Sequence, residues 1–326
     1  MSPNSQNTSA LGIAFISAGM VAISINDMLI KELSGEYPLH QMVFVRSAIG
    51  IIFSLMLVQM EGGWQILKTS RPGLHALRGG LLVIANMTYF TALAVMPLAD
   101  ATALFFAAPL FITLLSIPIL NEKVGPLRLS AVLIGFLGVI IMQRPWASGD
   151  ALEVSRIVLL LPVLSALTYA LNQLLTRKLG VESKASALAV YVQLMFILAA
   201  AGFWVVAGDG RYAEGVENES LIFLLRAWIW PAEGDWVFFI GLGLNSAIVG
   251  YCLSQAYRLS DAATVAPFEY LGLPLAVFWG WVVFAEFPQW EIWIGMALII
   301  SSGLFVFLWE QQKARQIARG EVNRRY

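Results

Sequence analysis

The sequence has only one cysteine, Cys252, and two histidines, His40 and His75, among its 326 residues. A single cysteine excludes an internal disulfide and any metal site built from several thiolates. The two histidines do not form an HExxH pair, and the GxSxG, P-loop and GxGxxG patterns are all missing. These absences predict that the protein is not an enzyme and that it uses no metal and no cofactor.

Charged residues are also scarce. They make up 13% of the chain, whereas apolar residues make up 59%, and the formal net charge is −1. Soluble globular proteins contain about 25% charged and about 45–50% apolar residues. A nearly neutral chain also lacks the basic surface that nucleic acid requires. The composition therefore predicts an integral membrane protein in contact with the lipid bilayer and without a nucleic-acid partner.

Ten apolar segments are long enough to cross the membrane, since a spanning helix needs about 20 residues. The run that starts at Leu11 is interpreted as the first span, because no cleavage pattern of a secretory signal follows it. The predicted spans are residues 11–33, 38–60, 74–95, 98–120, 126–143, 156–178, 185–207, 236–258, 262–285 and 290–309.

The distribution of basic residues predicts the orientation. Cytoplasmic loops are enriched in Lys and Arg. If the amino terminus lies inside, fourteen of the twenty basic residues fall on the inner side and six on the outer side. The inner residues are Lys68, Arg71, Arg78, Lys123, Arg128, Arg177, Lys178, Lys184, Arg258 and five in the tail. We therefore expect both termini in the cytoplasm, a location in the inner cell membrane, and a basic cytoplasmic tail at 311–326 that attracts anionic lipids.

The connection 208–235 is long and acidic, and it would lie outside. It contains the apolar run LIFLLRAWIW, which is too short to span a membrane. Trp228 and Trp230 favour an interfacial helix in this run. The residues leave two roles open for the connection, a surface decoration and a functional lid.

The chain contains an internal repeat. Asn, Leu, a basic residue and Leu recur at the same spacing in 26–33 and 172–179, and the fourth and ninth spans both end at a glutamate, Glu122 and Glu286. Each copy holds five spans, so the second copy enters the membrane from the opposite side. Inverted repeats of this kind are typical of transporters that expose a central site to each side in turn. The predicted halves are residues 1–145 and 151–310.

These features resemble the drug/metabolite transporter superfamily, in particular its EamA-type members. The resemblance rests on N-D-x-L-x-K in the first span, the following Arg46, PLADATALFFAAPLFITLLSIPILNE and SDAATVAPFEYLGLPLAVFWGWVVFAE, and it covers nearly the whole chain. It implies an all-α integral membrane protein of ten transmembrane helices in two inverted five-helix repeats. The long outer connection departs from the family pattern.

The same resemblance implies a secondary active transporter of a small organic metabolite that works by alternating access. The substrate classes it suggests are amino acids or their derivatives, vitamins, nucleoside-like compounds and quaternary amines. The alternative is an integral membrane enzyme or an assembly subunit that uses the helices as a scaffold. An enzyme would gather nucleophiles and acids at one depth, whereas the polar residues here recur in matching pairs in the two halves.

Glu269 is the first candidate for the transport site. It lies about two turns into the ninth span, and Gly272 and Ala276 share its helical face. A carboxylate beside small residues suits the wall of a cavity, where it would bind the substrate or exchange a coupling proton. The alternative is a carboxylate that a neighbouring helix satisfies. Phe105 occupies the matching position of the first half.

Asn86 and Tyr89 in the third span correspond to Asn245 and Val249 in the eighth. One amide from each half would thus lie near the middle of the membrane. Such amides either orient a ligand or hold helices together, and the residues leave both roles open.

Three prolines mark expected hinges, because proline removes a backbone hydrogen-bond donor and interrupts a helix. One lies in the fourth span and two lie in the ninth. They are Pro109, Pro267 and Pro274.

Asp27 and Arg46 raise a separate question, because a charge near the bilayer centre costs at least ~2.5–3.5 kcal/mol. Both lie about seven residues, or ~10 Å, below the outer surface. Lys31 lies one turn above Asp27 and either reaches the interface or shares its carboxylate. At the matching depth the second half carries an amide pair, Gln173 and Gln193. We expect Asp27 and Arg46 to latch the outer side, directly or through Lys31, or else to form a static staple between helices.

Overall fold

The computed structural model describes residues 3–121, 124–147, 155–179, 185–259 and 266–318, and every regular element in these ranges is a helix. Eight helices are long and apolar enough to cross a membrane, and two shorter apolar helices cover 126–142 and 268–284. The ten predicted spans therefore correspond to helices, although residues 262–265 lie outside the described part of the chain.

The helices divide between two halves. The first half contains α1 (Pro3–Leu33), α2 (Leu39–Glu61), η1 (Trp64–Leu67), α3 (Pro72–Leu93), α4 (Leu98–Phe105), α5 (Ala108–Leu120) and α6 (Pro126–Met142). The second half contains α7 (Arg156–Leu179), α8 (Ala185–Ala207), α9 (Glu219–Leu225), α10 (Trp236–Leu259), η3 (Ala266–Leu271), α12 (Gly272–Phe284) and α13 (Trp290–Ala318).

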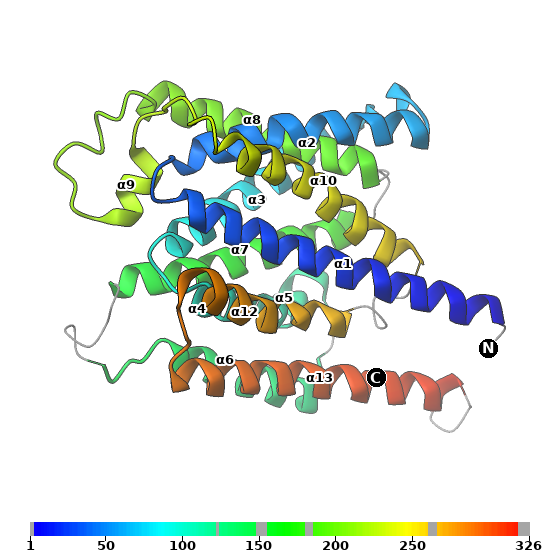
Figure 1. Cartoon of the computed structure of the whole chain (residues 1–326). Helices are drawn as coiled ribbons and strands as arrows, with labels where there is room; N and C mark the ends of the chain where they lie inside the picture. The colour runs from blue at the N-terminus through cyan, green and yellow to red at the C-terminus, as the bar shows by residue number, and fades with distance from the viewer. Residues whose placement is uncertain (1–2, 122–123, 148–154, 180–184, 260–265, 319–326) are drawn as a thin grey trace.

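The two ends of the bundle differ. The start of α1 and the last turns of α13 project from one end, which we call the termini end, and α9 lies at the other, which we call the α9 end (Figure 1). Helices α2 and α8 pack together along one edge of the bundle, and α6 and α13 pack together along the opposite edge. The remaining spans lie between these two pairs.

The packing of these central helices repeats when the two halves are exchanged. Helix α1 packs on α10, and its equivalent α7 packs on α3; likewise α2 packs on α10, and α8 packs on α3. Equivalent helices run in opposite directions, since α1 runs toward the α9 end and α7 runs away from it (Figure 1). The fold is therefore ten helices in two inverted halves, and a site between them can be approached from either end.

Both halves contain a broken span. The fourth span is divided between α4 and α5, which begins two residues after Phe106, and the ninth is divided between η3 and α12. Pro109 is the second residue of α5. A backbone N–H in the first turn has no hydrogen-bond partner within the helix, so proline is tolerated there. Pro267 lies in η3, and Pro274 is the third residue of α12. The chain is thus interrupted at the predicted hinge positions, whereas Pro118 lies within α5 without ending it.

Helices α5 and α12 are close equivalents. Each has 13 residues, and each ends at a residue in the left-handed conformation, Asn121 with φ 55° and Ala285 with φ 54°. In both, the N–H of this residue donates to the carbonyl oxygen five residues earlier. Left-handed residues are a common way to end a helix, but Ala rarely occupies that conformation. Two matching helix ends in a region of the repeat support a common structural plan for the two halves.

Helices α6 and α13 approach closely because glycines face each other where they cross. A Cβ atom at Gly138 would lie 2.9 Å from the carbonyl oxygen of Gly295, and one at Gly135 would lie 3.0 Å from Oγ of Ser302. Small residues of this kind allow dense packing between membrane helices, where the lipid provides no hydrophobic driving force.

The connection 208–235 packs on the start of α2. Gln41 donates to the carbonyl oxygen of Ile229 at 2.6 Å and accepts from its N–H at 3.2 Å. Tyr37 donates to Asp235 at 2.5 Å. Burial and this carboxylate raise the pKa of Tyr37, so its hydroxyl keeps the proton that it donates. The connection therefore joins the second half to the first at the α9 end.

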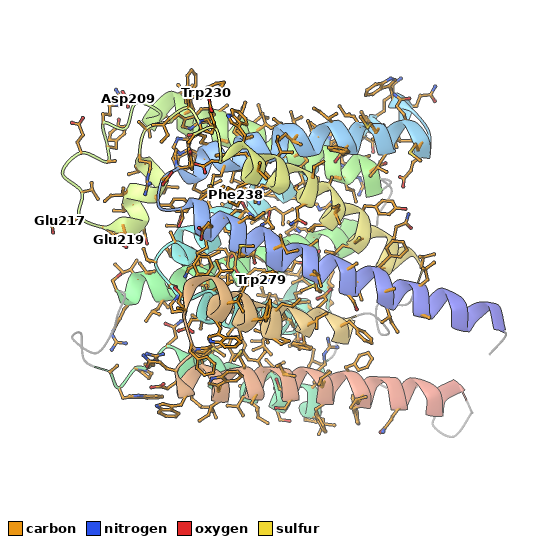
Figure 2. All side chains as sticks on the ribbon, in the orientation of Figure 1. Asp209, Glu217, Glu219, Trp230, Phe238 and Trp279 are labelled. Atoms are coloured by element: carbon orange, nitrogen blue, oxygen red, sulfur yellow. The ribbon has the colours of Figure 1, made fainter. Side chains whose placement is uncertain are left out.

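Two sequence expectations for the chain outside the spans need correction. The predicted interfacial helix is shorter than the apolar run, because α9 ends at Leu225 and Trp228 packs against the rings of His40 and Phe44 instead. Asp209, Glu217 and Glu219 project away from the bundle (Figure 2), whereas Asp235 binds Tyr37. The predicted tail starts as the last turns of α13, and residues 319–326 lie outside the described part of the chain.

Candidate functional site

A polar cluster lies between the first three spans. Asn26 bridges two charges: its amide nitrogen donates to Oδ1 of Asp27 at 3.2 Å, and its oxygen accepts from Arg46 at 3.5 Å. A second guanidinium nitrogen of Arg46 donates to the oxygen of Asn86 at 3.2 Å. The predicted direct contact and the predicted route through Lys31 are both wrong, because Asn26 joins Asp27 and Arg46. Their equal depth in the membrane stays a prediction.

Arg46 is held in an apolar environment. Its residue is 6% exposed, and the guanidinium carbon lies 5.8 Å from the ring centre of Phe90 and 5.5 Å from that of Phe196. The electron-rich faces of aromatic rings stabilise a cation in such a position. All the hydrogen bonds of the cluster join α1, α2 and α3, so they lie within the first half. The hydrogen bonds of the cluster therefore connect helices of the first half and do not tie the two halves together.

Lys31 points into the protein rather than toward the interface. Its ammonium group donates to the two carboxylate oxygens of Glu286 at 2.7 and 2.9 Å and to the carbonyl oxygen of Met96 at 2.5 Å. The prediction that Lys31 snorkels or shares the carboxylate of Asp27 is wrong. The fold explains the difference, because the end of α12 places the carboxylate of Glu286, from the other half, within reach of Lys31.

Three aromatic rings form a wall beside the polar cluster. Phe105, at the end of α4, lies with its ring centre 5.4 Å from that of Tyr89 in α3 and 5.5 Å from that of Tyr169 in α7. The Tyr89 hydroxyl donates to Oδ2 of Asp27 at 3.1 Å and lies 3.0 Å from the hydroxyl of Thr102. We call these three rings the aromatic wall. The wall joins the break in the fourth span to Asp27 in α1.

Glu269 belongs to η3, the first part of the broken ninth span, and directly precedes Tyr270 in the chain. The ring of Tyr270 stacks on that of Phe106 with centres 5.6 Å apart and planes 28° apart. Phe106 and Tyr270 lie sixteen residues before Glu122 and Glu286, respectively, so they hold equivalent positions in the two halves. The two broken spans therefore meet near the axis that relates the halves.

The local structure at Glu269 differs from the prediction. Glu269 belongs to η3, a 3₁₀ helix, whereas Gly272 and Ala276 belong to the following helix α12. They therefore do not form one face of a continuous α-helix. Glu269, Phe105 and Tyr169 are half-buried although they come from central helices. Partial exposure of polar and aromatic groups at this depth is what a ligand site requires.

The predicted pairs of amides are not formed. Gln173 donates to the hydroxyl of Tyr169 at 2.7 Å, and Gln193 donates to Oγ of Ser246 at 3.0 Å, so the two glutamines serve different neighbours. Asn245 donates to the carbonyl oxygen of Ala22 at 2.5 Å and thereby joins α10 to α1. Asn245 thus has the helix-holding role, and of the four amides predicted for the site, Asn86 and Gln173 contact its central residues.

Comparisons with known proteins match this architecture. The EamA-like transporter family matches residues 10–144. A riboflavin transporter of Vibrio cholerae is 31% identical over 304 residues, which cover 92% of this chain and 94% of that protein. The chain belongs to the EamA-like transporter family. It is a multi-pass membrane transporter of a small metabolite and not an enzyme.

Further relatives of this EamA-like transporter differ in their named substrates. An S-adenosylmethionine uptake transporter of Rickettsia bellii is 29% identical, and the match covers 94% of this chain and 96% of that protein. A solved crystal structure has 19% sequence identity to this chain and a TM-score of 0.60. The match covers 96% of this chain and 99% of the chain in that structure. At that identity the solved structure supports the fold alone.

Sequence reasoning missed several residues of this transporter's site. Tyr169 precedes Gln173 by one helical turn, and this spacing was the available signal for their hydrogen bond. Phe106 and Tyr270 were detectable only as equivalent aromatic residues in the repeat. Glu286 was recognised as a marker of the repeat, but nothing in the sequence pointed to Lys31 as its partner.

Proposed function

We propose that this transporter carries riboflavin or a closely similar compound, which combines a flat heteroaromatic ring with a hydroxylated chain. The observation that carries the proposal is the aromatic wall, Tyr89, Phe105 and Tyr169, at the break of the fourth span. A flat ring gains apolar burial and ring contacts on such a surface. The amide of Gln173 and the carboxylate of Glu269 supply partners for hydroxyl groups, as a selective site needs. The relative named as a riboflavin transporter supports the same substrate.

We propose further that the transporter works by alternating access. Both halves have a broken span, and the breaks meet through Phe106 and Tyr270 beside the aromatic wall. A change of angle at each break exposes the same site to one end of the bundle and then to the other. The inverted packing of the two halves supports this mechanism, because each arrangement has an equivalent with the ends exchanged.

A second candidate is a cationic heteroaromatic compound such as S-adenosylmethionine. The observation in its favour is that two carboxylates lie near the aromatic wall. Asp27 accepts a hydrogen bond from the Tyr89 hydroxyl, and Glu269 precedes Tyr270, whose ring stacks on Phe106 next to the wall. The relatives named as S-adenosylmethionine uptake transporters support it. Asp27 already accepts hydrogen bonds from Asn26 and Tyr89, so riboflavin remains the first choice.

We expect the purified protein in proteoliposomes to exchange labelled riboflavin, and riboflavin fluorescence to be quenched on binding. Phe105→Ala should weaken binding about tenfold, because it removes ring contacts worth ~0.5–1.5 kcal/mol together with apolar contact area. Phe238→Ala is the matched control, since Phe238 lies on the outer surface of α10 and is 38% exposed (Figure 2). Equal affinities in the two variants would contradict the role of the wall. Exchange of S-adenosylmethionine without exchange of riboflavin would select the second candidate.

We infer that both termini lie in the cytoplasm and that the α9 end faces outward, on the basis of the basic residues at the termini end. Cysteines at Ser70 and Glu217 should test this in a Cys252→Ser background, since both positions are exposed and the native cysteine is buried. A membrane-impermeant thiol reagent should label the Glu217→Cys variant in intact cells and the Ser70→Cys variant only after lysis. The opposite result would reverse the orientation.

A further inference from the structure

Lys31 and Glu286 form an ion pair at the α9 end that crosses from the first half to the second. The ammonium group of Lys31 in α1 lies 2.7 Å from the carboxylate of Glu286, which follows α12. The side chain of Lys31 is 8% exposed and that of Glu286 is 29% exposed. Lys31 also lies 5.0 Å from the ring centre of Phe284. The pair is therefore largely shielded from water, which strengthens it and makes its separation costly.

The same two side chains also bind the start of α4. The backbone N–H of Leu98 donates to Oε2 of Glu286 at 3.2 Å, and the carbonyl oxygen of Met96 accepts from Lys31 at 2.5 Å. Glu286 thus lies at the amino terminus of α4, where the helix dipole favours a negative charge. Three segments from both halves, α1, the start of α4 and the end of α12, meet at this one pair.

Further charges surround the pair. Asp100 of α4 lies 3.9 Å from Arg144, and Arg144 lies 3.8 Å from Glu291 at the start of α13. A cavity of about 70 Å³ borders Met96, Asp100 and Arg144. Such a volume holds a few water molecules, since one water occupies ~10–15 Å³ on this measure. The cavity also borders Phe287, which follows Glu286 in the chain.

The broken spans pack against each other at the α9 end. Helix α12 of the ninth span packs against α4 of the fourth span, and α1 packs against both. This conformation is therefore closed between the broken spans at the α9 end.

We propose that Lys31 and Glu286 form the latch that holds the α9 end closed, and that the latch opens when the site turns to that end. The proposal rests on the alternating-access mechanism proposed above. Opening moves α12 away from α1 and α4, so Glu286 loses both Lys31 and the N–H of Leu98, whereas Lys31 keeps the carbonyl oxygen of Met96. The latch therefore favours the conformation described here and determines how often the α9 end opens.

Distance measurements between spin labels test the latch without any substrate. Labels at Glu36→Cys and Gln289→Cys in the Cys252→Ser background report on the separation of the α1–α2 and α12–α13 connections, and both positions are exposed. Lys31→Met should shift the ratio of long to short distances by roughly tenfold or more toward the long ones. Arg211→Met is the matched control, because it removes a charge from an exposed pair with Asp209 at the same end.

The double variant Lys31→Met with Glu286→Gln separates a latch from a static staple. It leaves no stranded charge, and the glutamine oxygen still accepts from the N–H of Leu98. A latch predicts long distances in the single and the double variant. A staple predicts a lower melting temperature in the single variant, recovery in the double variant and wild-type distances in both, and that result would overturn the proposal. Failure to transport riboflavin would contradict the proposed substrate and leave these distances unaffected.

Discussion

Replacement of Arg46 by methionine is expected to lower the free energy of unfolding by about 3–5 kcal/mol, the usual cost of removing one partner from a buried charge pair. The variant leaves the charge of Asp27 in the membrane interior without a cation nearby. It also leaves Asn86 without the donor that lies 3.2 Å away in the wild type. Unfolding in mixed detergent micelles, followed by circular dichroism, measures the change.

The controls for Arg46 distinguish a brace from a ligand group. Arg211→Met should change stability by less than about 0.5 kcal/mol, because the Arg211 side chain is 57% exposed. Asp27→Asn combined with Arg46→Met should recover much of the loss, since neither charge is then stranded. Wild-type stability with loss of riboflavin binding in Arg46→Met would instead assign Arg46 to the transport site.

Glu269→Gln is expected to weaken riboflavin binding by roughly 10- to 150-fold, because a hydrogen bond to a charged group contributes ~1.5–3 kcal/mol. Glu269 supplies a carboxylate at the break of the ninth span, directly before Tyr270, whose ring stacks on Phe106 beside the wall. Lumiflavin, which has the same ring without the hydroxylated chain, should bind the variant and the wild type about equally. Calorimetric titration of both ligands measures the difference.

Other outcomes assign Glu269 to its alternative roles. Glu219→Gln is the matched control, since Glu219 projects from α9 at the surface (Figure 2) and should leave both affinities unchanged. If Glu269→Gln keeps its affinity for riboflavin but transport no longer responds to a pH gradient, Glu269 is a coupling site for protons. Wild-type affinity together with a wild-type pH response would return it to a structural role.

The sequence by itself determined the membrane class, the ten spans and the interruptions beside Pro109 and Pro274. These features are local, because about 20 apolar residues suffice for a span and a proline removes its own backbone donor. The repeat also determined that Phe105 and Glu269 hold matching positions, since its spacing is fixed in the covalent chain. Spacing along a helix also predicts depth in the membrane, and on this basis Asp27 and Arg46 are expected at one level.

Only the tertiary structure decided which side chains meet at each depth. Depth leaves open the rotation of each helix about its axis and the choice of its neighbour, so several partners were compatible with every polar residue. Lys31 has Asp27 one turn away in its own helix, yet it binds Glu286 at 2.7 Å, 255 residues along the chain. Gln173 and Gln193 hold the positions of Asp27 and Arg46 in the second half, and yet they bond to different neighbours. Hydrogen bonds and ion pairs form only within about 3–4 Å, and that proximity is set by how the two halves pack against each other.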